Sequence, residues 1–169
     1  MTQEELKGLY NSLRTKMKRK WGRDLPFDEL LFNRWDRAEN LGFGKGASIY
    51  HNSYVYGDVT VGEHTWIGPF TILDGTGVLN IGSYCSISAG VQIYTHDSVD
   101  WAISGGKAEY EKSPTIIGNN CYIGPNAVIT KGVTIGDGCV IGANSLINGN
   151  VPSGSRAFGS PYKIDGGEK

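Results

Sequence analysis

The stretch IGNNCYIGPNAVITKGVTIGDGCVIGANSLI, residues 117–147, decides the fold, because an isoleucine recurs in it at every sixth position. A six-residue period fits neither the 3.6-residue repeat of an α-helix nor a plain strand that ends in a turn. It is a repeat of the parallel β-helix, in which each hexad forms one short strand and one bend. The aliphatic positions are Ile117, Ile123, Ile129, Ile135, Ile141 and Ile147 in this stretch, Ile49, Val55, Val61, Ile67 and Leu73 in an earlier run, and Ile81, Ile87 and Ile93 in a run between the two.

A longer repeat of 18 residues overlies the hexads in the second half of the chain. Three hexads therefore make one turn, which predicts a triangular coil with three flat faces. The interior aliphatic side chains stack into one column, and burial at about 25 cal/mol per Å² makes this column the main stabilising contribution. The residues that recur at this distance are Cys121 and Cys139, Ala127 and Ser145, and Val133 and Val151.

The three cysteines, Cys85, Cys121 and Cys139, all lie four residues after an aliphatic anchor. Several other residues at this hexad position are small, such as Ser53 and Thr65. A buried free cysteine behaves as a small hydrophobic residue, and this spacing suits neither a metal site nor a disulfide framework. We therefore predict three buried thiols.

The composition limits the classes of function. The chain has 169 residues and a net charge of −1, which suits one core with a small appendage and gives no basic patch for nucleic acid. The first residues, MTQEELKGLY, do not resemble a signal peptide, and no apolar stretch has transmembrane length. We expect no stable membrane insertion and, by default, a cytoplasmic location.

The first 44 residues differ from the rest. Leu6, Leu13 and Met17 have helical spacing, and a second short helix is expected between Pro26 and Gly42. Basic residues in the range 16–20 either face phosphate or a membrane, or form the solvated side of a helix that packs on the end of the coil; we favour the second. We predict an N-terminal helical cap at 1–44, a β-helix domain at 45–153 and a C-terminal tail at 154–169.

The hexad period fails twice. Two residues are inserted in the segment Asp74–Gly77, where we expect the coil to be displaced outward. The period then disappears over a polar and aromatic segment, for which we predict a loop at 94–116. Loops of this length in a compact domain are usually functional or disordered, and the aromatic residues favour function.

The hexads, the loop motif Tyr94-Thr95-His96-Asp97, the run IGPNAVITKGVTIGDGCVIGANS and the tail FGSPYKI together resemble the hexapeptide-repeat acetyltransferases. Within them the chain is most similar to the sugar O-acetyltransferase and xenobiotic acetyltransferase branch. The resemblance covers about residues 45 to 165. It implies a left-handed parallel β-helix, a homotrimer with active sites between neighbouring subunits, acetyl-CoA as co-substrate and no metal.

His96 is the candidate general base. Acyl transfer to a hydroxyl or amine requires removal of the acceptor's proton as the new bond forms, and imidazole suits this task. The family's catalytic histidine lies in the corresponding loop, so the resemblance gives this role to His96. The other two histidines, His51 and His64, lie on hexads at variable positions and are interpreted as surface residues.

Acceptor contacts are expected around the same loop. In related enzymes an aspartate at the first interruption lines the acceptor site, which implies that Asp74 either binds sugar hydroxyls or orients the imidazolium. A turn-forming role before a glycine is the structural alternative. Tyr94, Asp97 and Trp101 are the remaining candidates for substrate binding, although the aromatic residues can equally serve loop packing.

The donor site is implied by the C-terminal coils, where the family binds the pantetheine arm of CoA along a groove. Gly124 and Ala143 are the carried-over positions, because small side chains let an extended ligand approach the main chain. Many relatives have Thr-Lys near the last coil, but this chain has Asn148-Gly149. Lys131 and Lys163 are therefore the candidate contacts to the CoA phosphates.

The predicted function is transfer of an acetyl group from acetyl-CoA to a hydroxyl or amino group of a sugar or sugar nucleotide, in surface polysaccharide biosynthesis. The alternative acceptor is a xenobiotic or antibiotic hydroxyl. Two other classes are a zinc-binding β-helix enzyme of the carbonic-anhydrase kind and a non-catalytic scaffold. The three histidines do not have the spacing of a zinc site, and the histidine-containing loop disfavours a scaffold.

Overall fold

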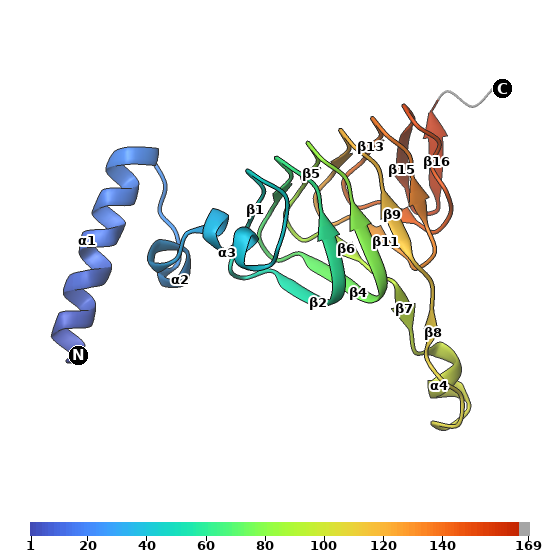
Figure 1. Cartoon of the computed structure of the whole chain (residues 1–169), viewed down its shortest axis with the longest axis horizontal. Helices are drawn as coiled ribbons and strands as arrows, with labels where there is room; N and C mark the ends of the chain where they lie inside the picture. Colours follow the sequence, from blue (N-terminus) through green and yellow to red (C-terminus); the bar gives the residue numbers. More distant parts are fainter. Residues whose placement is uncertain (166–169) are drawn as a thin grey trace.

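Stacked coils of very short strands form the body of the molecule (Figure 1). The computed structural model describes residues 1–165. Most strands have only two residues, because each hexad bends again after its aliphatic anchor. The strands of the coil and of its C-terminal hairpin are β1 (Ser48–Ile49), β2 (Tyr54–Val61), β3 (Trp66–Ile67), β4 (Ile72–Ile81), β5 (Ser86–Ile87), β6 (Gln92–Ile93), β9 (Thr115–Ile117), β10 (Tyr122–Ile123), β11 (Val128–Ile129), β12 (Thr134–Ile135), β13 (Val140–Ile141), β14 (Leu146–Ile147), β15 (Arg156–Gly159) and β16 (Tyr162–Asp165).

The strands pair in parallel from coil to coil, as the 18-residue repeat predicts. Ile123 lies beside Ile141, and Ile129 lies beside Ile147. One face is the sheet β1-β3-β5-β10-β13-β15-β16, and the other two faces are joined because β4 pairs with β6 near its start and with β9 at its end. The predicted fold class, a mainly β, left-handed parallel β-helix, is confirmed.

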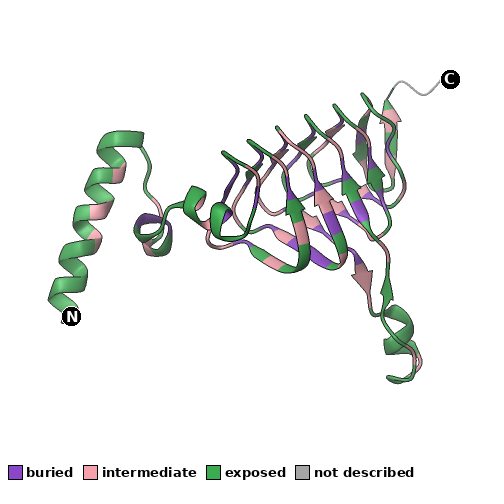
Figure 2. Cartoon of the chain, in the orientation of Figure 1, coloured by how far each residue is buried: buried purple, intermediate pink, exposed green. Residues whose placement is uncertain are grey.

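The core is a column of aliphatic side chains inside the coil. Figure 2 colours the buried residues purple, and they recur along the strands of successive coils. Complete burial of one such side chain contributes about 1.5–3 kcal/mol. The repeated anchors therefore account for most of the stabilisation of the coil. The largest fully buried side chains are Ile49, Ile67, Leu73, Leu79, Ile87, Ile93, Ile117, Ile123, Ile129, Ile135, Ile141 and Ile147.

A second interior column contains the three cysteines. Cys85, Cys121 and Cys139 are buried free thiols, as predicted. Each Sγ donates a hydrogen bond of 3.1 Å to a carbonyl of the following coil, on Gly118, Gly136 and Pro152 in turn. These thiols are therefore packing residues that also satisfy backbone acceptors.

Three helices precede the coil: α1 (Gln3–Trp21), α2 (Phe27–Leu31) and α3 (Arg34–Asn40). Helix α1 begins with a capping box between Thr2 and Glu5. The second predicted helix is divided in two, because the Asn33 side chain caps a new helix by accepting from the backbone N–H of Trp35 at 3.0 Å. Helix α1 contacts α2 and lies apart from the coil in Figure 1, so it is not packed on the coil in this single chain.

Helices α2 and α3 fix the first corner of the coil. Helix α3 packs against β1. The Arg37 guanidinium donates to the carbonyls of Tyr50 and, at 2.8 Å, Ser53. The buried Glu29 carboxylate accepts from the backbone N–H of His51. Among the described residues, no helix is long and apolar enough to cross a bilayer.

The C-terminal end of the coil is covered by a hairpin. Strand β15 pairs with β13 and then, in antiparallel orientation, with β16. Ala157 is buried and Ile164 packs against the core, so the tail closes the last coil. The final four residues of the predicted tail, 166–169, lie outside the described part of the chain.

The first interruption is a bulge inside a long strand rather than an outward excursion. Gly57 pairs with Gly75, but Val59 pairs with Leu79, so three residues of β4 oppose the single residue Asp58. The strand continues because the extended residues on both sides keep their pairing with β2. Leu79, six residues after Leu73, is buried and pairs with Val59, and the column of anchors resumes two residues later, where Ile81 pairs with Val61.

The second interruption is an outward loop, as predicted. It contains β7 (His96–Asp97), helix α4 (Val99–Ile103) and β8 (Glu111–Lys112), and it projects away from the coil in Figure 1. Strands β7 and β8 form a two-residue antiparallel ribbon at its base. On either side of the loop the column continues in register, because Ile93 pairs with Ile129.

Candidate active site

The bulge and the base of the loop meet around Asp74. Asp74 lies just before the bulge, where it pairs with Tyr56, and its Oδ1 accepts from the backbone N–H of Thr76 at 3.0 Å and from its hydroxyl at 2.6 Å. The bulge is also tied to the loop, because the N–H of Gly77 donates to the Thr95 hydroxyl at 2.7 Å. A side chain at Gly77 would place a Cβ 2.4 Å from the Thr95 carbonyl oxygen. Only glycine permits this close approach.

Asp74 and His96 form a hydrogen-bonded pair. The Nδ1 atom of His96 lies 2.6 Å from Asp74 Oδ2, which also accepts from the backbone N–H of Thr95 at 2.9 Å. An ionised carboxylate can only accept, so Nδ1 carries the hydrogen and Nε2 keeps a lone pair. The Asp74 side chain is 2% exposed and that of His96 is 33% exposed. A buried carboxylate therefore holds a partly exposed imidazole.

Asp74 is ionised well below neutral pH. Burial alone would raise the pKa of this carboxyl, but hydrogen bonds from Thr76, Thr95 and His96 together outweigh it and lower the pKa to about 2. Both carboxylate oxygens are engaged inside the protein. Of the two functional roles considered for Asp74, this position supports orientation of the imidazole rather than contact with sugar hydroxyls.

Aromatic side chains of the loop lie next to His96. The Tyr110 ring is 6.2 Å from the imidazole, edge to face, and the Trp101 ring is 5.9 Å from Tyr110, measured between ring centroids. Trp101 and Tyr110 also line a hollow of about 410 Å³ in the loop. Tyr94 is directed to the coil instead, where its hydroxyl bonds Gln92 Oε1 at 2.8 Å. Trp101 therefore contacts the aromatic neighbour of His96, whereas the Tyr94 hydroxyl is bonded to a residue of the coil.

Lys131 joins the coil to the base of the loop. Its Nζ lies 2.9 Å from Asp97 Oδ2 and 2.7 Å from Glu111 Oε2. Hydrogen bonds to Glu111 and Asp97 raise the pKa of Lys131, and the hydrogen bond from Lys131 lowers the pKa of Asp97. Lys131 was predicted to contact a CoA phosphate, but in this structure two carboxylates hold its ammonium group.

The other predicted donor residues lie elsewhere on the C-terminal coils. Gly124 and Ala143 are neighbours in successive coils, and a Cβ at Gly124 would lie 2.6 Å from the backbone nitrogen of Ala143. Coil packing alone thus explains the glycine. Ala143 is exposed, and Lys163 is exposed on β16. No hydrogen bond or ion pair between described residues joins these three to His96.

Sequence reasoning missed two residues of the site, Thr76 and Thr95. Each donates to Asp74, and Thr95 also joins the bulge to the loop. Their positions carried a signal, because Thr76 stands two residues after Asp74, where an aspartate commonly accepts from the backbone, and Thr95 directly precedes His96. The signal is weak, since such threonines are common in turns.

The remaining histidines are not part of this site. His64 is exposed and stacks on Tyr84 at 5.0 Å, and His51 packs on Phe32 at 5.3 Å. His51 is only partly exposed, and its Nε2 is buried. Within residues 1–165, no three histidine, cysteine, aspartate or glutamate side chains are grouped so as to hold a metal ion.

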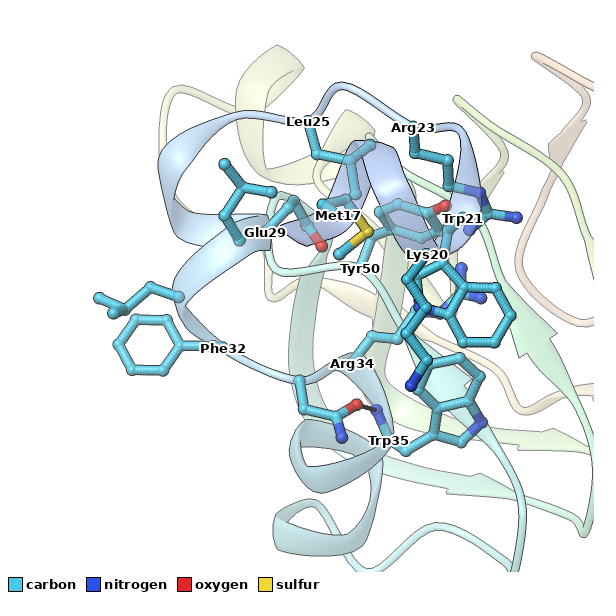
Figure 3. Close-up of a pocket in the computed structure, with 13 residues that line it drawn as sticks. Met17, Lys20, Trp21, Arg23, Leu25, Glu29, Phe32, Arg34, Trp35 and Tyr50 are labelled. Carbon is cyan, nitrogen blue, oxygen red and sulfur yellow. Dashed lines mark hydrogen bonds between the residues drawn. The ribbon is translucent and has the colours of Figure 1, made fainter. Parts of the chain in front are cut away.

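A separate pocket of about 460 Å³ lies among the N-terminal helices (Figure 3). The Arg34 guanidinium stacks there on the rings of Trp35 and Tyr50, at 4.3 Å and 5.0 Å from their centroids. None of the predicted site residues lines this pocket. Its lining residues are Met17, Lys20, Trp21, Arg23, Leu25, Glu29, Leu30, Leu31, Phe32, Asn33, Arg34, Trp35 and Tyr50.

The chain is similar to known transferases in sequence and in structure. Residues 114–149 match the family model described as bacterial transferase hexapeptide (six repeats). Nodulation protein L of Rhizobium meliloti (strain 1021) is 37% identical over 132 residues, which are 76% of this chain and 72% of that protein.

Two solved structures share the fold. A hexapeptide-repeat-containing acetyltransferase from Vibrio cholerae superposes with a TM-score of 0.69 at 26% identity, covering 98% of this chain and 92% of that one. The same enzyme has been solved in complex with acetyl coenzyme A. A maltose O-acetyltransferase from Clostridium difficile 630 gives a TM-score of 0.57 at 26% identity, covering 95% and 87%. The chain therefore belongs to the bacterial hexapeptide-repeat transferases and is an acyltransferase.

Proposed function

We propose that the chain transfers an acetyl group from acetyl-CoA to a hydroxyl or amino group of a sugar or sugar nucleotide, with His96 as general base. The observation that carries the proposal is the 2.6 Å bond from His96 Nδ1 to the buried Asp74 carboxylate. This bond fixes the tautomer in which Nε2 can accept a proton. It also stabilises the imidazolium that forms when the proton arrives.

The reaction proceeds by direct transfer. As the acceptor oxygen or nitrogen attacks the thioester carbon, its proton passes to His96 Nε2 and the carbonyl electrons form a tetrahedral oxyanion, which a backbone N–H stabilises. The intermediate collapses, the bond from carbon to sulfur breaks, and the imidazolium returns the proton to the CoA thiolate. Cys85 is 2% exposed and bonded to a backbone carbonyl, which disfavours an acyl-enzyme on this thiol.

A sugar acceptor is supported by the loop and by one relative. Trp101 and Tyr110 offer ring faces on which the apolar face of a sugar can pack, beside the imidazole. The Clostridium relative is named for transfer to maltose. Surface polysaccharide biosynthesis is the proposed setting, because the segment from Tyr94 to Trp101 resembles that group of enzymes.

Acetyl-CoA as donor is supported by the complex of the Vibrio relative with that molecule. We assign the pantetheine arm to the groove past Gly124 and Ala143, and positive charge near the phosphates to Lys163. The cytoplasm is the proposed location, since acetyl-CoA is made and used there.

A homotrimer with its active sites between subunits completes the proposal. The outward-facing residues of one face form a mainly apolar row in register from coil to coil, which suits burial against a second copy. The number three comes from the family resemblance. The row consists of Tyr54, Ile72, Gln92, Val128 and Leu146.

The test compares His96→Asn with His64→Asn. Asparagine suits both positions, since it can still bond Asp74 and it tolerates the positive φ of 55° at His64. The assay measures release of CoA thiol from acetyl-CoA with a panel of sugars, sugar nucleotides and hydroxylated antibiotics. His96→Asn should lower kcat by on the order of 10²–10⁴-fold, whereas His64→Asn should not change it.

Three results would contradict the proposal. Full turnover by His96→Asn would show that His96 is not the general base. Release of CoA before the acceptor binds would replace direct transfer by an acyl-enzyme. Transfer to antibiotics and to no sugar would show that the acceptor is a xenobiotic or antibiotic hydroxyl instead of a sugar.

A further inference from the structure

Lys131 connects two parts of the chain that are distant in sequence. It lies in the bend after β11 of the coil, and it contacts Asp97 on β7 and Glu111 on β8. The two contacts are 2.9 and 2.7 Å long, and the Lys131 side chain is only 18% exposed. A lysine with two carboxylate partners and little solvent contact differs from an ordinary surface lysine, for which a single exposed pair contributes little.

The two carboxylates that Lys131 contacts are direct cross-strand partners. In the β7–β8 ribbon Asp97 is paired with Glu111, and His96 with Lys112. Like charges directly opposite each other destabilise an antiparallel pair. The ribbon has only two residue pairs and, at its base, one further backbone bond from the N–H of Ser113 to the carbonyl of Thr95, so few hydrogen bonds oppose this repulsion. The Lys131 ammonium lies where it neutralises both charges.

The same ribbon carries the groups around the proposed reaction centre. His96 immediately precedes Asp97, and Tyr110 immediately precedes Glu111. His96 is held from the coil side by Asp74, whereas Tyr110 is 6.2 Å from the imidazole across the ribbon. A separation of the two strands would therefore move Tyr110 away from an imidazole that stays in place.

We propose that Lys131 is a positioning residue, which holds Asp97 and Glu111 together and thereby keeps the aromatic wall at Tyr110 against the acceptor side of His96. This inference rests on the proposed function of His96. Lys131 acts through the ribbon and touches no reacting atom. It thereby sets acceptor affinity, while the His96–Asp74 pair sets the rate of the chemical step.

The test uses Lys131→Met, which keeps the unbranched aliphatic stem of the side chain and removes its ammonium group. We expect KM for the acceptor to rise about tenfold with kcat within about twofold and KM for acetyl-CoA unchanged. Lys131→Arg, which can bond both carboxylates, should restore KM to near the wild-type value. Lys45→Met, at an exposed lysine at the start of the coil, is the matched control.

Hydrogen exchange of the loop tests the inference independently of activity. Backbone amides of β7 and β8 should exchange faster in Lys131→Met. They should return toward the wild-type rate in the triple variant D97N/E111Q/K131M, in which residues 97 and 111 no longer repel each other. Exchange is measured on the whole protein by mass spectrometry, and Lys45→Met should match the wild type.

The outcomes separate this inference from the function on which it rests. Unchanged acceptor KM and unchanged exchange in Lys131→Met would overturn the positioning role. A rise in KM for acetyl-CoA alone would overturn it too, and would assign Lys131 to the donor. If the β7 and β8 amides of the triple variant exchange as fast as those of Lys131→Met, repulsion between Asp97 and Glu111 is not the reason for the faster exchange. If the wild type acetylates nothing in the panel, the proposed function fails, while the exchange result still reports on the ribbon.

Discussion

Replacement of Asp74 by asparagine tests the central pair most sharply, because it changes charge and hydrogen-bonding capacity at nearly constant volume. In the wild type Oδ1 accepts from Thr76, and Oδ2 accepts from Thr95 and His96. Both oxygens therefore face a backbone N–H. An amide nitrogen at either position places a donor against a donor, which costs about 1–3 kcal/mol.

The catalytic consequence depends on which way the amide turns. With its nitrogen toward His96, the amide donates to Nδ1, the ring hydrogen moves to Nε2 and the base loses its lone pair. With its oxygen toward His96, the tautomer survives, but the charge that stabilises the imidazolium is gone. In both cases we expect kcat to fall by on the order of 10²–10⁴-fold, or about 3–5 kcal/mol in activation free energy.

The assay is steady-state acetyl transfer to whichever acceptor the panel identifies, together with binding of acetyl-CoA measured by calorimetry. Binding of the donor should not change, since Asp74 is buried against the loop and lies on none of the C-terminal coils. Asp58→Asn is the matched control, because Asp58 is an exposed carboxylate directly opposite the same bulge. A kcat within threefold of the wild type in a folded Asp74→Asn protein would refute the assignment of Asp74 as the residue that orients His96.

Two further predictions concern stability. Because the pKa of Asp74 is lowered to about 2 in the folded protein from an ordinary value of 3.8, its ionisation stabilises the fold above about pH 4, and this contribution of about 2 kcal/mol is lost as the pH falls toward 2. The free energy of unfolding in urea, measured between pH 2 and 5, should show this loss in the wild type and not in Asp74→Asn. The same pH dependence in both proteins would contradict the prediction. Ile129→Ala should lower the free energy of unfolding by about 2–5 kcal/mol, because this side chain is 0% exposed in the core column, whereas Ile116→Ala, at 42% exposed on β9, should cost less than about 1 kcal/mol. Denaturant titrations of both proteins check the difference, and equal losses would mean that the column is not the main source of stability.

The coil could be predicted from the sequence because its energetics are local and repeated. An aliphatic residue every six positions and a small residue four positions later define both interior columns, and the register of Ile123 with Ile141 follows from three hexads per turn. The bulge could not be predicted in the same way. Two extra residues fit either an excursion or a bulge, and only pairing of β4 with β2 decides between them.

The helical region was less predictable. One continuous helix was expected from Pro26 to Gly42, but the local capping bond of Asn33 competes with continuation and divides it. The position of α1 depends on contacts between elements, and helical spacing of Leu6, Leu13 and Met17 does not reveal which surface they face. In this chain they contribute no buried residue to the coil.

At the candidate site, sequence reasoning identified the residue types but not all of their partners. His96 and Asp74 were singled out because both stand where the hexads fail, and the structure brings them together. Lys131 was predicted to bind the phosphates of CoA, because a lysine on a C-terminal coil suggests a phosphate contact. Its carboxylate partners are 20 and 34 residues earlier in the chain, and only the folded loop brings them to it.

The projecting loop does not interrupt the column of core side chains, because Ile93 and Ile129 lie on adjacent rungs of the ladder. The projecting segment 94–114 therefore adds no rung to the ladder, although Asp74 and Lys131 of the coil bind its base. Exchange of the outer part of this segment, beyond the Thr95 and Ser113 anchors, would leave the ladder of isoleucines intact. If the proposed function holds, grafting a different loop onto this scaffold would change the acceptor preference and leave the coils that we assign to the donor unchanged.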